Sequence, residues 1–165
     1  MKLYPVKVGT RFFDSHPVRA TDPGYDTSDK ACYIDGIDIH CGYYDCVAWK
    51  GRQYFTDCDG KRYGERLVFV CGIYLSSLGY DVSGLTRHEI GCIGVDAGMA
   101  GFFQHKPDYD EDGWYDFCNK MYKRDSLITN EGFCTSSGYG DGVYPVYAYT
   151  DKSGETVALE IAFVE

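Results

Sequence analysis

The stretch from Val143 to Val164 holds two runs in which side chains alternate between two faces, separated by the turn sequence Asp151-Lys152-Ser153-Gly154. Because successive side chains of a β-strand point to opposite sides of a sheet, this alternation predicts strands at Val143–Tyr149 and Thr156–Val164. The residues between them are typical of a β-hairpin turn. A hairpin of this kind favours an antiparallel sheet with at least one buried face. The residues expected to share one face of the second strand are Val157, Leu159, Ile161 and Phe163.

Similar runs predict strands across the rest of the chain, and one segment has helical spacing instead. Gly113–Lys123 places its apolar residues on one helical face, and Thr86–Glu89 is expected to form a second, shorter helix. Residues 1–165 should therefore form a single domain that is mainly β (α+β), an antiparallel β-sandwich or curled sheet with one packed α-helix. The apolar helix residues are Trp114, Phe117, Cys118 and Met121. The further predicted strands are Pro17–Thr21, Cys32–His40, Tyr43–Lys50, Gln53–Asp57, Arg66–Leu75, Cys92–Val95, Ala100–Gln104 and Gly132–Ser136.

A weak internal repeat runs through these predicted strands. The string GYYDCVAW, followed by DCDGKRYGERLVFV, parallels GVYPVYAY, followed by TDKSGETVALEIAFV. Each copy follows an aspartate at a strand end, Asp22 in one case and Asp96 in the other. A duplicated half-sandwich explains the pattern, and so does chance similarity between two amphipathic hairpins.

The formal charge of −9 restricts the partners of the chain. Duplex affinity depends on Lys and Arg that neutralise phosphates, so an acidic chain is expected to bind no nucleic acid and no anionic membrane. There is no apolar run of the roughly 20 residues that a spanning helix needs, and no secretory signal, so a cytoplasmic location is expected. The eight cysteines are then expected to be free thiols, with Cys71 and Cys92 in the core.

Motifs for metals and catalysis are weak. Asp108-x-Asp110-x-Asp112-Gly113 reproduces the start of an EF-hand calcium loop, but the twelfth position is Asn119 instead of Glu, and capping of the following helix is the favoured interpretation. His40, Cys41, Cys46 and Cys58 lack the CxxC spacing of structural zinc sites. The histidines at 16, 40, 88 and 105 share no spacing with a nucleophile. No catalytic residue, metal or cofactor is predicted, and a non-enzymatic function is favoured.

Two glycine-rich segments and one basic hairpin are candidates for ligand contact. Ser136–Gly142 and Gly91–Gly101 could present backbone N–H groups to an anion, although tight turns are the commoner use of such glycines. The guanidinium group of arginine can donate two hydrogen bonds to one phosphate. The basic residues gathered in one hairpin are Lys50, Arg52, Lys61, Arg62 and Arg66.

Several strings in this chain also occur, in the same order, in one protein family. They are TDPGYD from residue 21, KRYGERLVFV at 61–70, GVDAGMAGFF at 94–103, and SSGYGDGVYPVY followed by GETVALEIAF. Over residues 18–165 the chain resembles a family, built on a domain of unknown function, from gut Firmicutes and their phages. Where other members carry DPCY and VDSG, this chain has DPGY and VDAG, so Gly24 and Ala97 lack those polar groups. The resemblance implies an accessory protein in the bacterial host cytoplasm, of a kind that includes binders of nucleotide-derived immune signals.

The favoured function is therefore non-enzymatic binding of a small, phosphate-bearing molecule. Tyr25, Tyr139 and Tyr144 would stack on this ligand, and Arg62 or Arg66 would neutralise its phosphate. The loops at 94–98 and 138–142, with Gly98, Ser137 and Gly138, would donate N–H groups. Asp22, Asp96 and Asp141 would bond ligand hydroxyls or hold their turns. The alternatives are an acidic interaction module that inhibits a host protein and a small hydrolase, and a homo-oligomer remains open.

Overall fold

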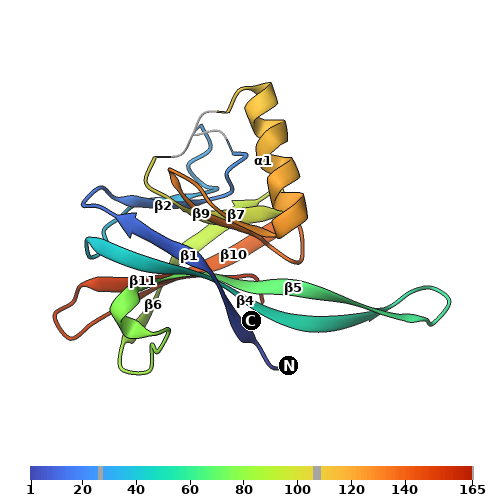
Figure 1. The fold of residues 1–165 in the computed structure, drawn as a ribbon, viewed down its shortest axis with the longest axis horizontal. Coiled ribbons are helices and arrows are strands. Elements are labelled where there is room, and N and C mark those ends of the chain that lie inside the picture. The colour runs from blue at the N-terminus through green and yellow to red at the C-terminus, as the bar shows by residue number, and fades with distance from the viewer. Residues whose placement is uncertain (26–27, 106–108, 165) are drawn as a thin grey trace.

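The computed structural model describes residues 1–25, 28–105 and 109–164, apart from the side chains of residues 63–66. In this part of the chain, two antiparallel sheets pack face to face and one helix covers the outer side of the smaller sheet (Figure 1). The prediction of a mainly β fold with one packed helix is confirmed. The six-stranded sheet runs in the order β1 (Tyr4–Phe13), β4 (Gly42–Thr56), β5 (Arg62–Leu75), β11 (Thr156–Ala162), β10 (Gly142–Thr150), β6 (Thr86–Val95). The five-stranded sheet runs in the order β3 (Ile34–Ile37), β2 (Val18–Thr21), β7 (Met99–Phe103), β9 (Gly132–Ser136), β8 (Ser126–Ile128).

The main core lies between the two sheets. Ile73 and Leu159 of the six-stranded sheet and Phe102 and Phe133 of the five-stranded sheet are fully buried in it. Burial of each such side chain contributes about 1.5–3 kcal/mol. The alternation predicted for the C-terminal hairpin is present, since Val146 and its neighbours on one face join this core.

The helix α1 (Glu111–Arg124) is capped by an aspartate at each end, Asp110 before it and Asp125 after it. The Asp110 carboxylate accepts the N–H of Gly113 at 2.8 Å, which is the predicted capping role; Asp108 lies outside the described residues. Phe117 and Met121 pack on the five-stranded sheet. Among the described residues, no helix is both long and apolar enough to cross a membrane.

The six-stranded sheet has an internal two-fold pattern. Counted from either edge, the order is the same, with β1-β4-β5 in one half and β6-β10-β11 in the other. Phe13 pairs with Gly42 at the end of β1, and Val95 pairs with Gly142 at the end of β6. In both halves an edge strand is followed by a strand of the other sheet, β2 or β7, and these two strands pair with each other.

The irregularities of the ladders match as well. The register of β1 against β4 shifts between Lys7 and Gly9, and that of β6 against β10 shifts between Glu89 and Gly91. Both shifts lie at the equivalent place, opposite Val47 in one half and Tyr147 in the other. Matched bulges are specific features of a chain trace, so they support a duplicated half-sandwich over chance similarity.

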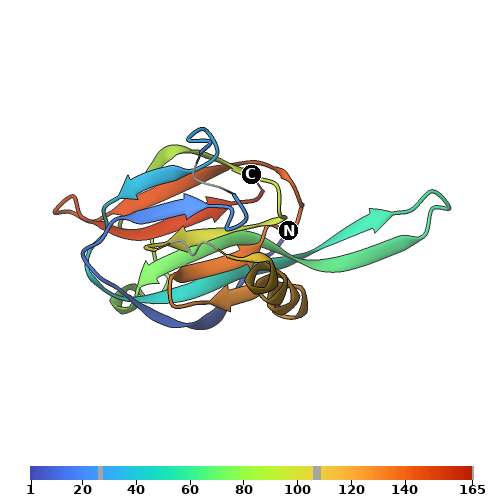
Figure 2. The ribbon, with the colours of Figure 1, turned by 90° about the horizontal axis from the view of Figure 1, so that it is seen from above.

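The two halves differ in two insertions. The helix α1 and strand β8 occur only in the second half. The β4–β5 hairpin has strands of 15 and 14 residues, against 9 and 7 for the β10–β11 hairpin. From residue 51 to residue 67 these two strands pair only with each other, and Figures 1 and 2 show them projecting from the sandwich as an arm. We call residues 51–67 the arm.

Some predictions about elements are wrong. Thr86–Glu89 is not a helix; it is the first part of the edge strand β6 and is exposed on both faces. Gln53–Asp57 is not a separate strand, because Gln53–Thr56 continues β4 into the arm. Cys92 is exposed on β6, whereas Cys71 is buried as predicted. Strands β1 and β8 were not predicted. All eight cysteines belong to the described part of the chain and are unpaired.

Candidate functional site

A basin of about 570 Å³ lies where the arm joins the sandwich. It is lined by Arg52, Tyr54 and Arg62 of the arm, by Tyr139 from the loop before β10, and by Met1 and Val164. Its volume lies in the range of roughly 300–1,000 Å³ common for small-molecule sites. Of the residues predicted to contact a ligand, Arg62 and Tyr139 come together here.

Tyr139 is held in place at the edge of this basin. Its ring packs edge-on against Phe69, with 5.8 Å between ring centroids, and its hydroxyl donates to Oε1 of Gln53. The residue is still 38% exposed. Burial raises the pKa of its hydroxyl above the ordinary value, which moves ionisation of this group further from physiological pH. The ring can therefore stack on a ligand without rearrangement of its anchors.

The two arginines of the basin have no carboxylate partner among the described side chains. The ion pairs of the described residues involve Lys7, Arg19, Lys50, Lys120 and two histidines, not Arg52 or Arg62. Both arginines lie on the arm and are exposed. In a chain with a charge of −9, two guanidinium groups that have no carboxylate partner among the described side chains make this basin locally attractive to an anion.

The predicted glycine loops meet each other, and several of their N–H groups are bonded within the protein. The N–H of Ser137 donates to the Gly98 carbonyl at 2.9 Å, which joins the two loops. The N–H of Gly138 donates to Ser136 Oγ, and the N–H of Gly140 donates to Ser137 Oγ. Gly98 and Gly138 have φ of 66° and 72°, which glycine adopts without strain. This geometry supports the turn interpretation for these donors rather than an anion nest.

Asp22 holds a turn from a fully buried position. Its carboxylate accepts the N–H of Gly24 at 2.7 Å, of Asp96 at 2.8 Å and of Ala97 at 2.6 Å. Burial raises the pKa of this carboxyl group, against the opposing effect of the three N–H donors. Asp22 therefore fastens the β6–β7 loop, which is the turn-holding role predicted for this residue.

Among the remaining predicted contact residues whose side chains the structure describes, none lines the basin. Tyr144 is buried in the main core and donates its hydroxyl to the Gly140 carbonyl at 3.0 Å. Tyr25 is half-buried, and burial, followed by the nearby Cys32, raises the pKa of its hydroxyl to about 12. Asp96 and Asp141 are exposed in their loops. The side chain of Arg66 lies outside the described residues.

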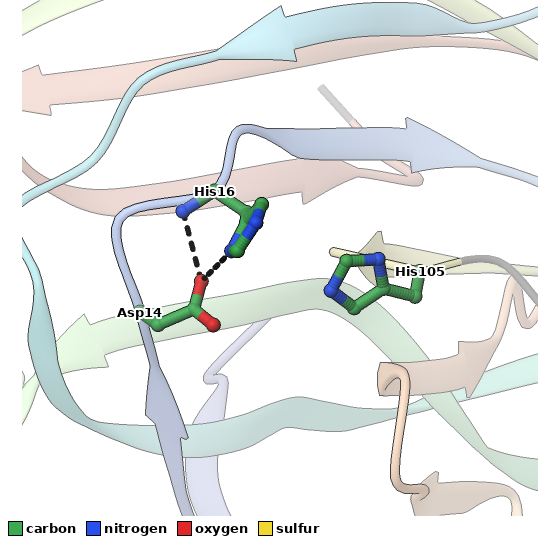
Figure 3. A group of neighbouring side chains, drawn as sticks. All are labelled: Asp14, His16 and His105. Carbon is green, nitrogen blue, oxygen red and sulfur yellow. Dashed lines mark hydrogen bonds and ion pairs between the residues drawn. The ribbon is translucent and has the colours of Figure 1, made fainter.

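A second constellation, which the sequence did not predict, lies where β1 ends and β2 begins. Asp14 and His16 belong to this connection, and His105 follows β7. One potential ligand atom from each residue lies within 4.8 Å of the others, and Figure 3 shows the three side chains gathered in one place. The rings of His16 and His105 have centroids 5.2 Å apart. Residues so far apart in the sequence meet because β2 pairs with β7, and no local motif indicates this pairing.

A groove of about 500 Å³ also lies beside α1. Lys120 and Arg124 of the helix line it, together with Tyr109, Leu127 and Glu131. Lys120 pairs with Asp116 at 2.7 Å, so one of the two cations that line the groove already has a carboxylate partner. This groove therefore offers an anion less than the basin at the arm does.

Comparison with known proteins adds no further assignment. No family description, curated protein or solved structure matches this chain.

Proposed function

We propose that this protein binds a small, phosphate-bearing molecule of nucleotide size in the basin at the base of the arm. The observation that carries the proposal is the joint presence of two guanidinium groups without described carboxylate partners and two tyrosine rings, on a basin of about 570 Å³. One guanidinium group can donate two parallel N–H bonds to the oxygens of a phosphate. A tyrosine ring can stack on a planar group such as a base. A nucleotide carries both features in one molecule.

The chemistry of the basin supports binding without turnover. The side chains that line it are arginine, tyrosine, glutamine, threonine, methionine and valine. None of these described residues is an aspartate, glutamate, histidine or cysteine, so the lining supplies no ordinary general base or thiol nucleophile. A protein that holds such a ligand and leaves it unchanged acts by sequestration.

A thermal-shift screen tests this function. We expect adenosine monophosphate or a cyclic dinucleotide to raise the midpoint of thermal unfolding, because a ligand that binds only the folded state stabilises it. Adenosine, which keeps the base and lacks the phosphate, should give a much smaller shift. Inorganic phosphate alone should also give a small shift, because it has no group to stack on the tyrosines.

Two results would count against the proposal. One is the absence of any shift with every phosphate-bearing compound. The other is hydrolysis of the bound compound by the purified protein, which would indicate an enzyme. Capture of a protein partner through the arm, with no small molecule bound, would favour the interaction module instead.

A further inference from the structure

The Asp14, His16 and His105 side chains present the donor atoms that transition metals prefer. Imidazole nitrogen suits Zn²⁺, Ni²⁺, Cu²⁺ and Fe²⁺, and two imidazoles with one carboxylate form a recurrent three-ligand face with open positions. A zinc ion with bond lengths of about 2.0–2.2 Å requires ligand atoms about 3.4 Å apart. The three donor atoms here all lie within 4.8 Å of one another, so rotation of exposed side chains can close the site.

The carboxylate is held ready for this role. Asp14 Oδ1 accepts the N–H of His16 at 2.8 Å and lies 2.9 Å from its ring Nδ1. Gln104 Nε2 donates to the same oxygen at 3.0 Å and to the His16 carbonyl at 2.7 Å. The bonds from Gln104, which is not itself a proposed ligand, are of the outer kind that orients metal ligands in known sites.

The internal two-fold pattern provides a comparison within the same molecule. Strand β1 is followed by Asp14, and its counterpart β6 is followed by Asp96. Gln104 fastens the first of these loops, and Asp22 fastens the second through the N–H groups of Asp96 and Ala97.

We call each of these loops, together with the residues that fasten it, a corner, and the second corner contains no histidine. Gly98 stands where the first corner has His16, and Pro23 follows Asp22 where His105 follows Gln104. The corner therefore folds without imidazoles. The two histidines of the first corner are not required by the chain trace, and their rings pack edge-on against each other.

From this geometry we propose that Asp14, His16 and His105 bind one divalent first-row transition metal ion. The side chains of His16 and Asp14 are 63% and 45% exposed, so the ion keeps coordination positions open to water or to a further ligand. The connection between β1 and β2 lies at the end of the sandwich away from the arm (Figures 1 and 2), so this site is separate from the proposed basin.

Isothermal titration with Ni²⁺ tests the site, with Co²⁺ absorption as a second readout. Wild-type protein should bind one equivalent, and both His16→Ala and His105→Ala should weaken binding by at least about 100-fold, beyond the 10–100-fold typical of outer-shell changes. The matched control is His88→Ala, which removes an exposed imidazole bonded to Thr150 on another part of the sheet. This control should bind as wild type does.

The Co²⁺ spectrum separates this site from the exposed thiols of Cys41, Cys58 and Cys92. Nitrogen and oxygen ligands give weak visible bands, whereas thiolate ligands add an intense near-ultraviolet band. A thiolate band, or unchanged Ni²⁺ affinity in either His16→Ala or His105→Ala, would overturn the proposal. Both variants change exposed residues, and circular dichroism should show that they fold as wild type does.

Discussion

Asp22 and Gln104 occupy equivalent positions in the two halves of the sandwich, and each fastens a loop of the opposite half. Asp22 follows β2 and accepts N–H groups from the β6–β7 loop. Gln104 follows β7, accepts the N–H of Asp14 at 3.2 Å, and donates to carbonyls of the β1–β2 loop. These reciprocal hydrogen bonds join the two halves of the sandwich within the five-stranded sheet, where β2 and β7 pair.

Replacing Asp22 by alanine should lower the free energy of unfolding by about 3 kcal/mol, because three N–H groups lose their acceptor. Urea unfolding at pH 7 measures this loss. Asp96→Ala is the control, since that side chain is exposed and its own N–H remains bonded to Asp22. A loss below about 1 kcal/mol for Asp22→Ala would contradict the fastening role.

Lys50 and Asp125 form a partly buried ion pair between β4 and the end of α1. The ammonium donates to both carboxylate oxygens, at 2.7 and 2.6 Å, and Lys50 is 8% exposed. Asp125→Asn keeps a residue that tolerates the φ of 58° but removes the charge, and it should cost about 2 kcal/mol. Lys120→Ala breaks an exposed pair on the same helix and should change stability by less than about 0.5 kcal/mol in the same unfolding assay. Equal losses in the two variants would contradict this ranking.

Tyr74 belongs to a hydrogen-bonded network of four side chains on the outer face of the six-stranded sheet. It accepts from Trp49 Nε1 at 2.8 Å and donates to Glu160 at 2.5 Å, and Tyr149 donates to the other Glu160 oxygen at 2.6 Å. Burial raises the pKa of Tyr74 well above its ordinary value, so it stays a donor. Tyr74→Phe should cost about 2 kcal/mol by thermal unfolding. Tyr122→Phe, at a residue 93% exposed, should cost nothing measurable, and a similar cost for both would exclude the network as the cause.

Asp45 should make stability dependent on acid pH. Burial raises the pKa of Asp45, but hydrogen bonds from Lys7, Ser76 and Thr10 outweigh this effect and hold the pKa below its ordinary value. The ionised carboxylate therefore stabilises the fold above the unfolded-state pKa of about 3.9, and this contribution is lost as pH falls through the folded-state pKa.

The measurement is the free energy of unfolding of Asp45→Asn and wild type between pH 7 and the acid limit of folding. The variant should be less stable at pH 7, by about 1 kcal/mol, and its stability should fall less steeply below about pH 4. Parallel curves for the two proteins in the acid range would assign the acid sensitivity to other carboxylates.

The sequence predicted most strands because their two faces differ in polarity. The C-terminal hairpin and the helix each bury one apolar face, and a period of two or of 3.6 residues reveals it. Thr86–Glu89 was predicted wrongly because an edge strand exposed on both faces has no such alternation. β8 has three residues, too few to show any period.

The candidate sites likewise divide into residues that the local sequence indicates and residues that only the fold brings together. Arg62 and Tyr139 were predicted as ligand contacts from residue type, and they line one basin. The loop N–H groups had two available interpretations, and only their partners Asp22, Ser136 and Ser137 decide between them. His16 and His105 meet through the pairing of two strands distant in sequence, and long-range pairing leaves no local signal.

The most direct test of phosphate binding at the arm is the affinity of the phosphate-bearing compound selected by the thermal-shift screen, measured by calorimetry on matched arginine variants. We expect Arg52→Gln and Arg62→Gln each to weaken binding by at least about 10-fold, since a hydrogen bond to a charged group contributes roughly 1.5–3 kcal/mol. Arg87→Gln should leave the affinity unchanged, because this arginine of strand β6 stacks on Tyr147 of strand β10. Equal affinities for all four proteins would contradict the account, because the ligand would then bind somewhere other than this basin.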